Sequence, residues 1–123
     1  MRTHIVAADL KKMHERSQKI FVDVFDEKME ITQENMLTAL AKGLPVFCFD
    51  RLISHTVRAE YERATNAAVA EYKEVTAPAR VRFKAAVMRN SEALIAEYQR
   101  ELEAPMNEYH KKATSALVAA LTS

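Results

Sequence analysis

The residues of this chain that could support metal or acid–base chemistry are poorly grouped. Two ligands on one helix face lie three or four residues apart, as in Glu-x-x-His or His-Glu-x-x-His patterns. No two histidines have this spacing and neither pattern occurs; the histidines are His4, His14, His55 and His110. We therefore expect no metal site and interpret the histidines as surface residues.

Nucleophilic catalysis and phosphate binding also find little support. Ser54 and His55 are adjacent, but adjacent helical residues point about 100° apart and cannot act on each other directly. Phosphate-binding loops need several glycines, whereas Gly43 is the only one. Cys48 is the single cysteine, which excludes an intramolecular disulfide, and its apolar neighbours predict a buried small hydrophobe. We expect neither enzymatic activity nor a cofactor.

Four acidic residues recur at helical spacing early in the chain. They are Asp23, Glu27, Glu30 and Glu34. Steps of four, three and four residues would place them on one face of a continuous helix. Such a stripe could bind a basic partner or a divalent ion, or it could be a solvated outer face.

A basic segment follows later, with four positive charges and no acid over residues 79–91. The basic residues are Arg80, Arg82, Lys84 and Arg89. The segment could be solvated or internally paired, could dock on an acidic protein surface, or could contact a phosphate backbone. Nucleic acid is the least favoured partner, because only Phe83 offers a stacking surface. Pairing of the acidic and basic segments, within one copy or between copies, would satisfy both and indicates self-assembly.

Composition sets the class of fold that positions these residues. The chain has 123 residues, one glycine, three prolines and no tryptophan, which is typical of an all-α protein of one domain. Lys and Arg number 18 against 17 Asp and Glu, so no global charge attracts nucleic acid or membrane. The longest uncharged run, residues 113–123, is shorter than the ~20 residues that span a bilayer. With no leader pattern at the start, we expect a cytoplasmic protein.

The periodicity predicts three helical regions within a single domain over residues 1–123. The first covers residues 5–42, with a break near 30–32 where Thr32 could cap a second helix. Lys42-Gly43-Leu44-Pro45 then ends that helix and starts the next. The second region, 45–104, is kinked or broken near 76–78. A C-terminal helix, 105–122, ends in an amphipathic tail that we expect to dock on the bundle.

Aromatic and apolar residues recur every 11 residues in the second half of the chain. One series is Tyr61, Tyr72, Phe83 and Leu94, and the other is Val87, Tyr98 and Tyr109. A spacing of 11 corresponds to 3.67 residues per turn and keeps each series on one helix face. The first series runs through Pro78 without a phase change, which indicates a kink, whereas compactness would favour a reversal there.

The joint at residues 42–45, with Phe49 and Leu52 after it, resembles the helix–Lys-Gly-Leu-Pro–helix joint of the lambda-type Gam proteins. Those are small, all-helical, dimeric phage proteins that inhibit a host exonuclease by occupying its DNA-end site. The resemblance covers residues 42–52 alone, and the rest of the chain has no counterpart. It implies an inhibitor of a host nucleic-acid enzyme, and it carries over no functional residue.

We therefore expect an all-α fold, either a helical bundle or an elongated coiled-coil-like hairpin. Apolar positions outnumber those that one extended helix could shield, so a homo-oligomer is favoured over a lone monomer. The leading function is a non-enzymatic interaction, self-assembling or adaptor protein. The alternatives are a Gam-like inhibitor and direct nucleic-acid binding through residues 80–89.

Overall fold

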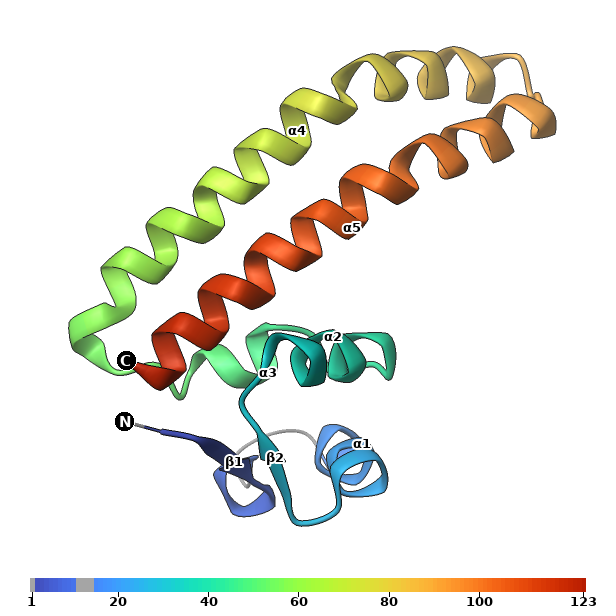
Figure 1. The fold of residues 1–123 in the computed structure, drawn as a ribbon. Coiled ribbons are helices and arrows are strands. Elements are labelled where there is room, and N and C mark those ends of the chain that lie inside the picture. Colours follow the sequence, from blue (N-terminus) through green and yellow to red (C-terminus); the bar gives the residue numbers. More distant parts are fainter. Residues whose placement is uncertain (1, 11–14) are drawn as a thin grey trace.

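The chain folds into a small N-terminal unit and a long helical hairpin (Figure 1). We call residues 2–10 and 15–57 the cap, and α4 and α5 form the hairpin. The computed structural model describes residues 2–10 and 15–123. In chain order the elements are β1 (His4–Val6), the 3-10 helix η1 (Ala7–Leu10), α1 (Glu15–Phe25), β2 (Lys28–Glu30), α2 (Gln33–Ala41), α3 (Phe47–Asp50), the 3-10 helix η2 (His55–Val57), α4 (Arg58–Met88) and α5 (Glu92–Thr122). This confirms the predicted all-α class and its hairpin alternative.

The helical region predicted over residues 5–42, with a break near 30–32, missed the two strands β1 and β2. β1 and β2 form an antiparallel pair in which Ile5 lies opposite Met29. Both side chains are buried, while their neighbours on each strand are exposed. Three residues of alternation are too few to stand out against a helical pattern. Asp26, with φ of 62°, ends α1 and turns the chain toward β2.

The predicted capping residue at the start of α2 and the predicted glycine at its end are both confirmed. The Thr32 hydroxyl oxygen accepts a hydrogen bond from the backbone N–H of Asn35 at 3.1 Å, which caps the helix start. Gly43 adopts φ of +101° after the helix end, and Leu44 N–H donates to Ala39 O at 2.8 Å.

The long helix predicted to start at residue 45 begins at Arg58 instead. α3 has only four residues, and a turn and η2 separate it from α4. The guanidinium of Arg58 donates to the carbonyl oxygen of Asp50 at 2.8 Å. Arg58 thus satisfies a carbonyl that a continued helix would have bonded itself.

Neither internal proline interrupts a helix. α4 runs through Pro78 and α5 through Pro105, so the predicted boundaries at 104–105 were wrong and the kink near 76–78 is the correct alternative. α4 bends in its second half, the part that contains Pro78 (Figure 1). The reversal falls at residues 89–91, where Asn90 has φ of 52° and the Ser91 hydroxyl accepts from Leu94 N–H.

The main core joins the cap to the base of the hairpin. Its largest side chains from the cap include Phe21 and Phe49, and the hairpin contributes Tyr61, Leu117 and Leu121. The predicted docking of the C-terminal tail is therefore confirmed. No described residue from 62 to 115 belongs to this cluster. α5 also contacts α2 near Lys111, and the outer part of the hairpin is held by its own seam.

Part of the predicted 11-residue repeat forms that seam, whereas Leu94 and Val87 lie on the other helix from the rest of their series and are exposed. Tyr72 lies against Tyr109 with ring centroids 5.9 Å apart, and Phe83 stacks on Tyr98 at 4.2 Å. From the first pair to the second, the residue number rises by 11 on α4 and falls by 11 on α5. Between and beside the rings, α4 buries small side chains that let the helices approach closely; they are Ala68, Thr76, Ala79 and Ala86.

Candidate functional site

The predicted acidic stripe does not lie on one helix face. Asp23 is on α1, Glu27 in the following turn, Glu30 on β2 and Glu34 in the first turn of α2. All four side chains are exposed. The spacing argument failed because it assumed a continuous helix, whereas the turn at Asp26 and strand β2 interrupt it.

The basic segment lies on the outer half of α4, and two of its members bond within the hairpin. The guanidinium of Arg80 donates to Lys73 O at 2.6 Å, and Arg82 forms an ion pair with Glu101 of α5 at 2.5 Å. Lys84 and Arg89 are exposed. Among residues 2–10 and 15–123, no ion pair joins the acidic residues 23–34 to this segment. Pairing of the two segments within one copy therefore finds no support in the structure.

The outer half of the hairpin projects beyond the cap. The contacts of α5 with α2 include a hydrogen bond from Gln33 Nε2 to Lys111 O at 2.9 Å and extend outward to Asn107, which lies beside Leu37 and Leu40. Beyond this level, the two helices continue away from the rest of the chain (Figure 1). We call residues 76–105 the arm; at 1.5 Å per residue it is roughly 20 Å long.

The arm and the residue just inside it carry most of the exposed apolar surface. Five of the eight large hydrophobic side chains that are exposed in the described chain lie here: Val75, Val81, Val87, Met88 and Leu94. Met88, the last residue of α4, is 87% exposed and Val81 is 70% exposed. At 100° per residue, Val75, Val81 and Val87 lie on three different faces of α4, so the exposed apolar side chains are distributed around the arm.

Charge is divided between the two helices of the arm. From residue 76 to 89, α4 and its C-cap carry four positive charges and no negative one. The facing stretch of α5, residues 92–105, has four acids, Glu92, Glu97, Glu101 and Glu103, against the single base Arg100. The arm is thus basic along one helix and acidic along the other.

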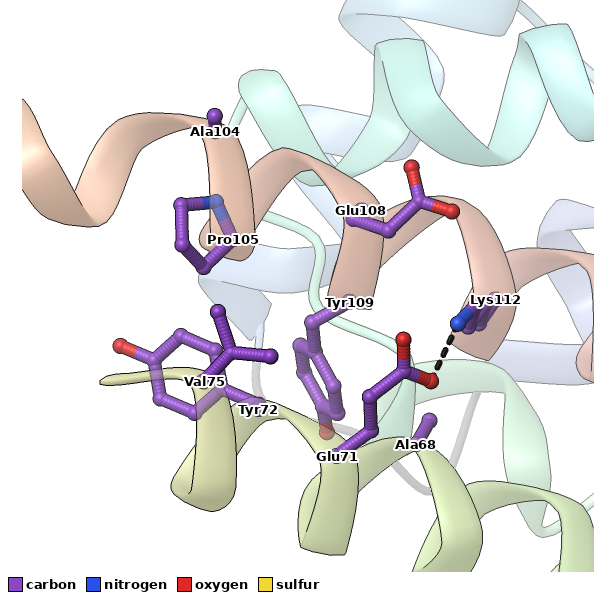
Figure 2. Close-up of a pocket in the computed structure, with 9 residues that line it drawn as sticks. All are labelled: Ala68, Glu71, Tyr72, Val75, Ala104, Pro105, Glu108, Tyr109 and Lys112. Carbon is purple, nitrogen blue, oxygen red and sulfur yellow. Dashed lines mark hydrogen bonds and ion pairs between the residues drawn. The ribbon is translucent and has the colours of Figure 1, made fainter. Parts of the chain in front are cut away.

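An apolar pocket of about 260 Å³ lies between the helices at the inner end of the arm (Figure 2). Its walls are the rings of Tyr72 and Tyr109 together with Val75, Ala104 and Pro105. The rim carries Glu108 and an ion pair between Glu71 and Lys112. Sequence reasoning missed this pocket, although Ala68 and Ala104 are small residues at a level where two tyrosines meet.

Among the described residues, burial shifts the pKa values of Cys48, Asp50, Tyr61 and His110, and the Asp50 carboxyl interacts electrostatically with Cys48 and Tyr61. Burial raises the pKa of the Cys48 thiol. Burial also raises the pKa of Tyr61 to about 12, so this phenol stays neutral at physiological pH. Cys48 is buried, as predicted. Burial also lowers the pKa of His110, which lies beside Leu37 and Leu40 at the contact with α2. These groups stabilise packing and are not arranged as nucleophile and base.

Two further features bear on the predicted absence of metal and membrane sites. Within the described parts of the chain, no three or more His, Cys, Asp or Glu side chains converge as a metal site would require. His14 lies outside the described residues. No described helix is both long and apolar enough to cross a membrane.

Comparisons with protein-family models, curated proteins and solved structures gave no match. The similarity to the Gam proteins therefore rests on residues 42–52 alone, which form the joint between α2 and α3 and its continuation into Leu52.

Proposed function

We propose that this chain is a non-enzymatic interaction protein that self-associates through the arm. The observation that carries this proposal is a two-helix projection, outside the main core, that bears most of the exposed large hydrophobic side chains of the described residues.

The packing of the arm favours a partner. Its fully buried side chains are Thr76, Ala79 and Ala86, and the rings of Phe83 and Tyr98 are only half-buried. Burial of apolar surface stabilises by about 25 cal/mol per Å², and alanines contribute little of it. Two hairpins that pack together as a four-helix arrangement would bury further apolar side chains of the arm.

The charge division favours a second copy as that partner. When two arms pack about a two-fold axis, the basic α4 of each copy can lie beside the acidic α5 of the other. Such an interface is self-complementary and closes at the dimer. An arm that carried charges of only one sign would instead have favoured a partner of opposite charge.

Direct nucleic-acid binding has less support. Arg82 is paired with Glu101, Arg80 is bonded to a backbone carbonyl, and the acids of α5 lie next to the basic segment. An adaptor or Gam-like inhibitor would use the same exposed arm for a different protein, but no feature of the arm favours a foreign partner over a second copy.

Light scattering in line with size-exclusion chromatography tests the proposal with two matched variants. Val81→Asp puts a charge on the arm, and Val22→Asp puts the same charge on an exposed valine of α1. We expect wild type and Val22→Asp to have twice the 14.0 kDa chain mass, and Val81→Asp to be monomeric. A Val81→Asp protein that dimerises as tightly as wild type would contradict the role of the arm.

A further inference from the structure

We propose that Met88 of one copy fills the Tyr72–Tyr109 pocket of a second copy, and that this contact fixes how two arms pack. The inference rests on the proposed self-association and adds the residues that would specify it.

Met88 has the properties of an inserting side chain. It ends α4 at the tip of the arm and is the most exposed large hydrophobic residue of the described chain. Methionine is unbranched and flexible, so it adapts to irregular apolar cavities. Arg89 follows it directly and is also exposed, which places a positive charge beside the apolar side chain.

The pocket suits such a side chain better than a free ligand. Its volume of about 260 Å³ is below the roughly 300–1,000 Å³ of typical small-molecule sites. Its walls are almost wholly apolar, and two of them are tyrosine rings, beside which a thioether sulfur packs favourably. Figure 2 shows both rings between the helices, with the charged groups confined to the rim.

The rim complements Arg89 in charge. Glu71 is already paired with Lys112, but Glu108 has no hydrogen-bond or ion-pair partner among the described residues. Glu108 therefore leaves a negative charge at the edge of the pocket. When Met88 enters, its neighbour Arg89 would lie near this carboxylate.

The distances along the arm allow two such contacts at once. Met88 lies 16 residues beyond Tyr72 on α4, which corresponds to roughly 24 Å of helix. Two arms that overlap antiparallel over this length bring each tip to the inner end of the other arm. A two-fold axis then makes the two contacts identical, and the assembly closes as a dimer.

Four single variants at exposed positions test this contact through the dissociation constant of the dimer, measured by sedimentation equilibrium. Met88→Ser removes the inserting side chain, and Ala104→Leu fills the pocket without loss of helix propensity. Met88→Leu and Ala70→Leu are their controls, the second at an exposed alanine of α4 outside the pocket. We expect about tenfold weaker dimers for the first two variants, a smaller loss for Met88→Leu, which keeps an apolar side chain but lacks the sulfur, and nearly unchanged dimers for Ala70→Leu.

A charge exchange tests the register independently. Arg89→Glu and Glu108→Arg should each weaken the dimer several-fold, and the double variant should recover most of the loss. Dimers of unchanged affinity in Met88→Ser and Ala104→Leu, or no recovery in the double variant, would overturn this contact while leaving self-association intact. A wild-type chain that stays monomeric at every concentration would overturn both proposals.

Discussion

At the scale of single residues, three backbone positions decide where helices stop. Asp26, Gly43 and Asn90 all have positive φ, and each ends a helix. Only the glycine was evident from the sequence, because a glycine after an apolar repeat has one common use. Asp and Asn tolerate the same conformation but occur in many other settings. The turn at Asn90, followed by the capping Ser91, was therefore overlooked.

Gly43→Ala should lower the free energy of unfolding by about 1–2 kcal/mol, because φ of +101° is unfavourable for a residue with a Cβ. Steric crowding does not contribute, because the nearest atom to an added Cβ would be Ile20 Cδ1 at 3.7 Å, an ordinary van der Waals contact. Urea unfolding followed by circular dichroism measures the change. Gly43→Asn should cost less than Gly43→Ala, and equal stability of Gly43→Ala and wild type would contradict the account.

His110 should make stability fall as the pH decreases. Its pKa in the folded chain lies below the ordinary value of 6.5, because burial disfavours the charged ring. The unfolded state therefore binds the proton more readily than the folded state. The stability that neutral His110 provides is lost as pH falls below about 6.5. His110→Gln should reduce this slope between pH 7.5 and 5.5 in urea titrations, whereas His55→Gln, at an exposed site, serves as the control. An unchanged slope in His110→Gln would contradict the assignment.

At the scale of elements, the seam between α4 and α5 follows from the 11-residue spacing. The sequence predicted that Tyr72 shares a face with Phe83 and Tyr98 with Tyr109, and the ring pairs confirm this. It wrongly extended the two series to Leu94 and Val87, because the chain reverses at residues 89–91. It could not predict the strands β1 and β2, because their pairing depends on contact between segments more than 20 residues apart. Pro78 alone does not reveal whether a helix bends or ends; here the continuous packing of α4 on α5 accompanies the bend.

Phe83→Ala should loosen the arm without unfolding the cap. Loss of a stacked ring removes about 0.5–1.5 kcal/mol beyond the loss of buried area, and these contacts lie outside the main core. Hydrogen exchange should therefore accelerate several-fold in residues 76–105 and stay unchanged in α1 and α2. Equal acceleration in the cap would show that the arm and cap unfold as one unit.

At the scale of the whole molecule, the cap anchors a projecting arm. The acidic residues 23–34 lie in the cap and the basic segment lies on the arm, so their opposite charges found no pairing in one copy. The charge division that matters to the proposed function lies within the arm, between α4 and α5. The sequence contained both sets of charges but could not show that residues 80–89 and 92–103 face one another, since that depends on where the chain reverses.

Salt should weaken the proposed dimer. Charge pairs at an interface between exposed arms are screened over a Debye length of about 8 Å at physiological ionic strength and about 3 Å at 1 M salt. The dissociation constant should therefore rise with sodium chloride concentration, and more steeply for wild type than for Arg89→Glu. A dimer that tightens steadily with salt would show that apolar contacts alone govern association.

Sedimentation velocity of the wild-type chain over a dilution series tests the central claim most directly. The account predicts an elongated species of twice the 14.0 kDa chain mass, which dissociates to a single smaller species on dilution. A 14.0 kDa species alone, at every concentration, would contradict self-association through the arm.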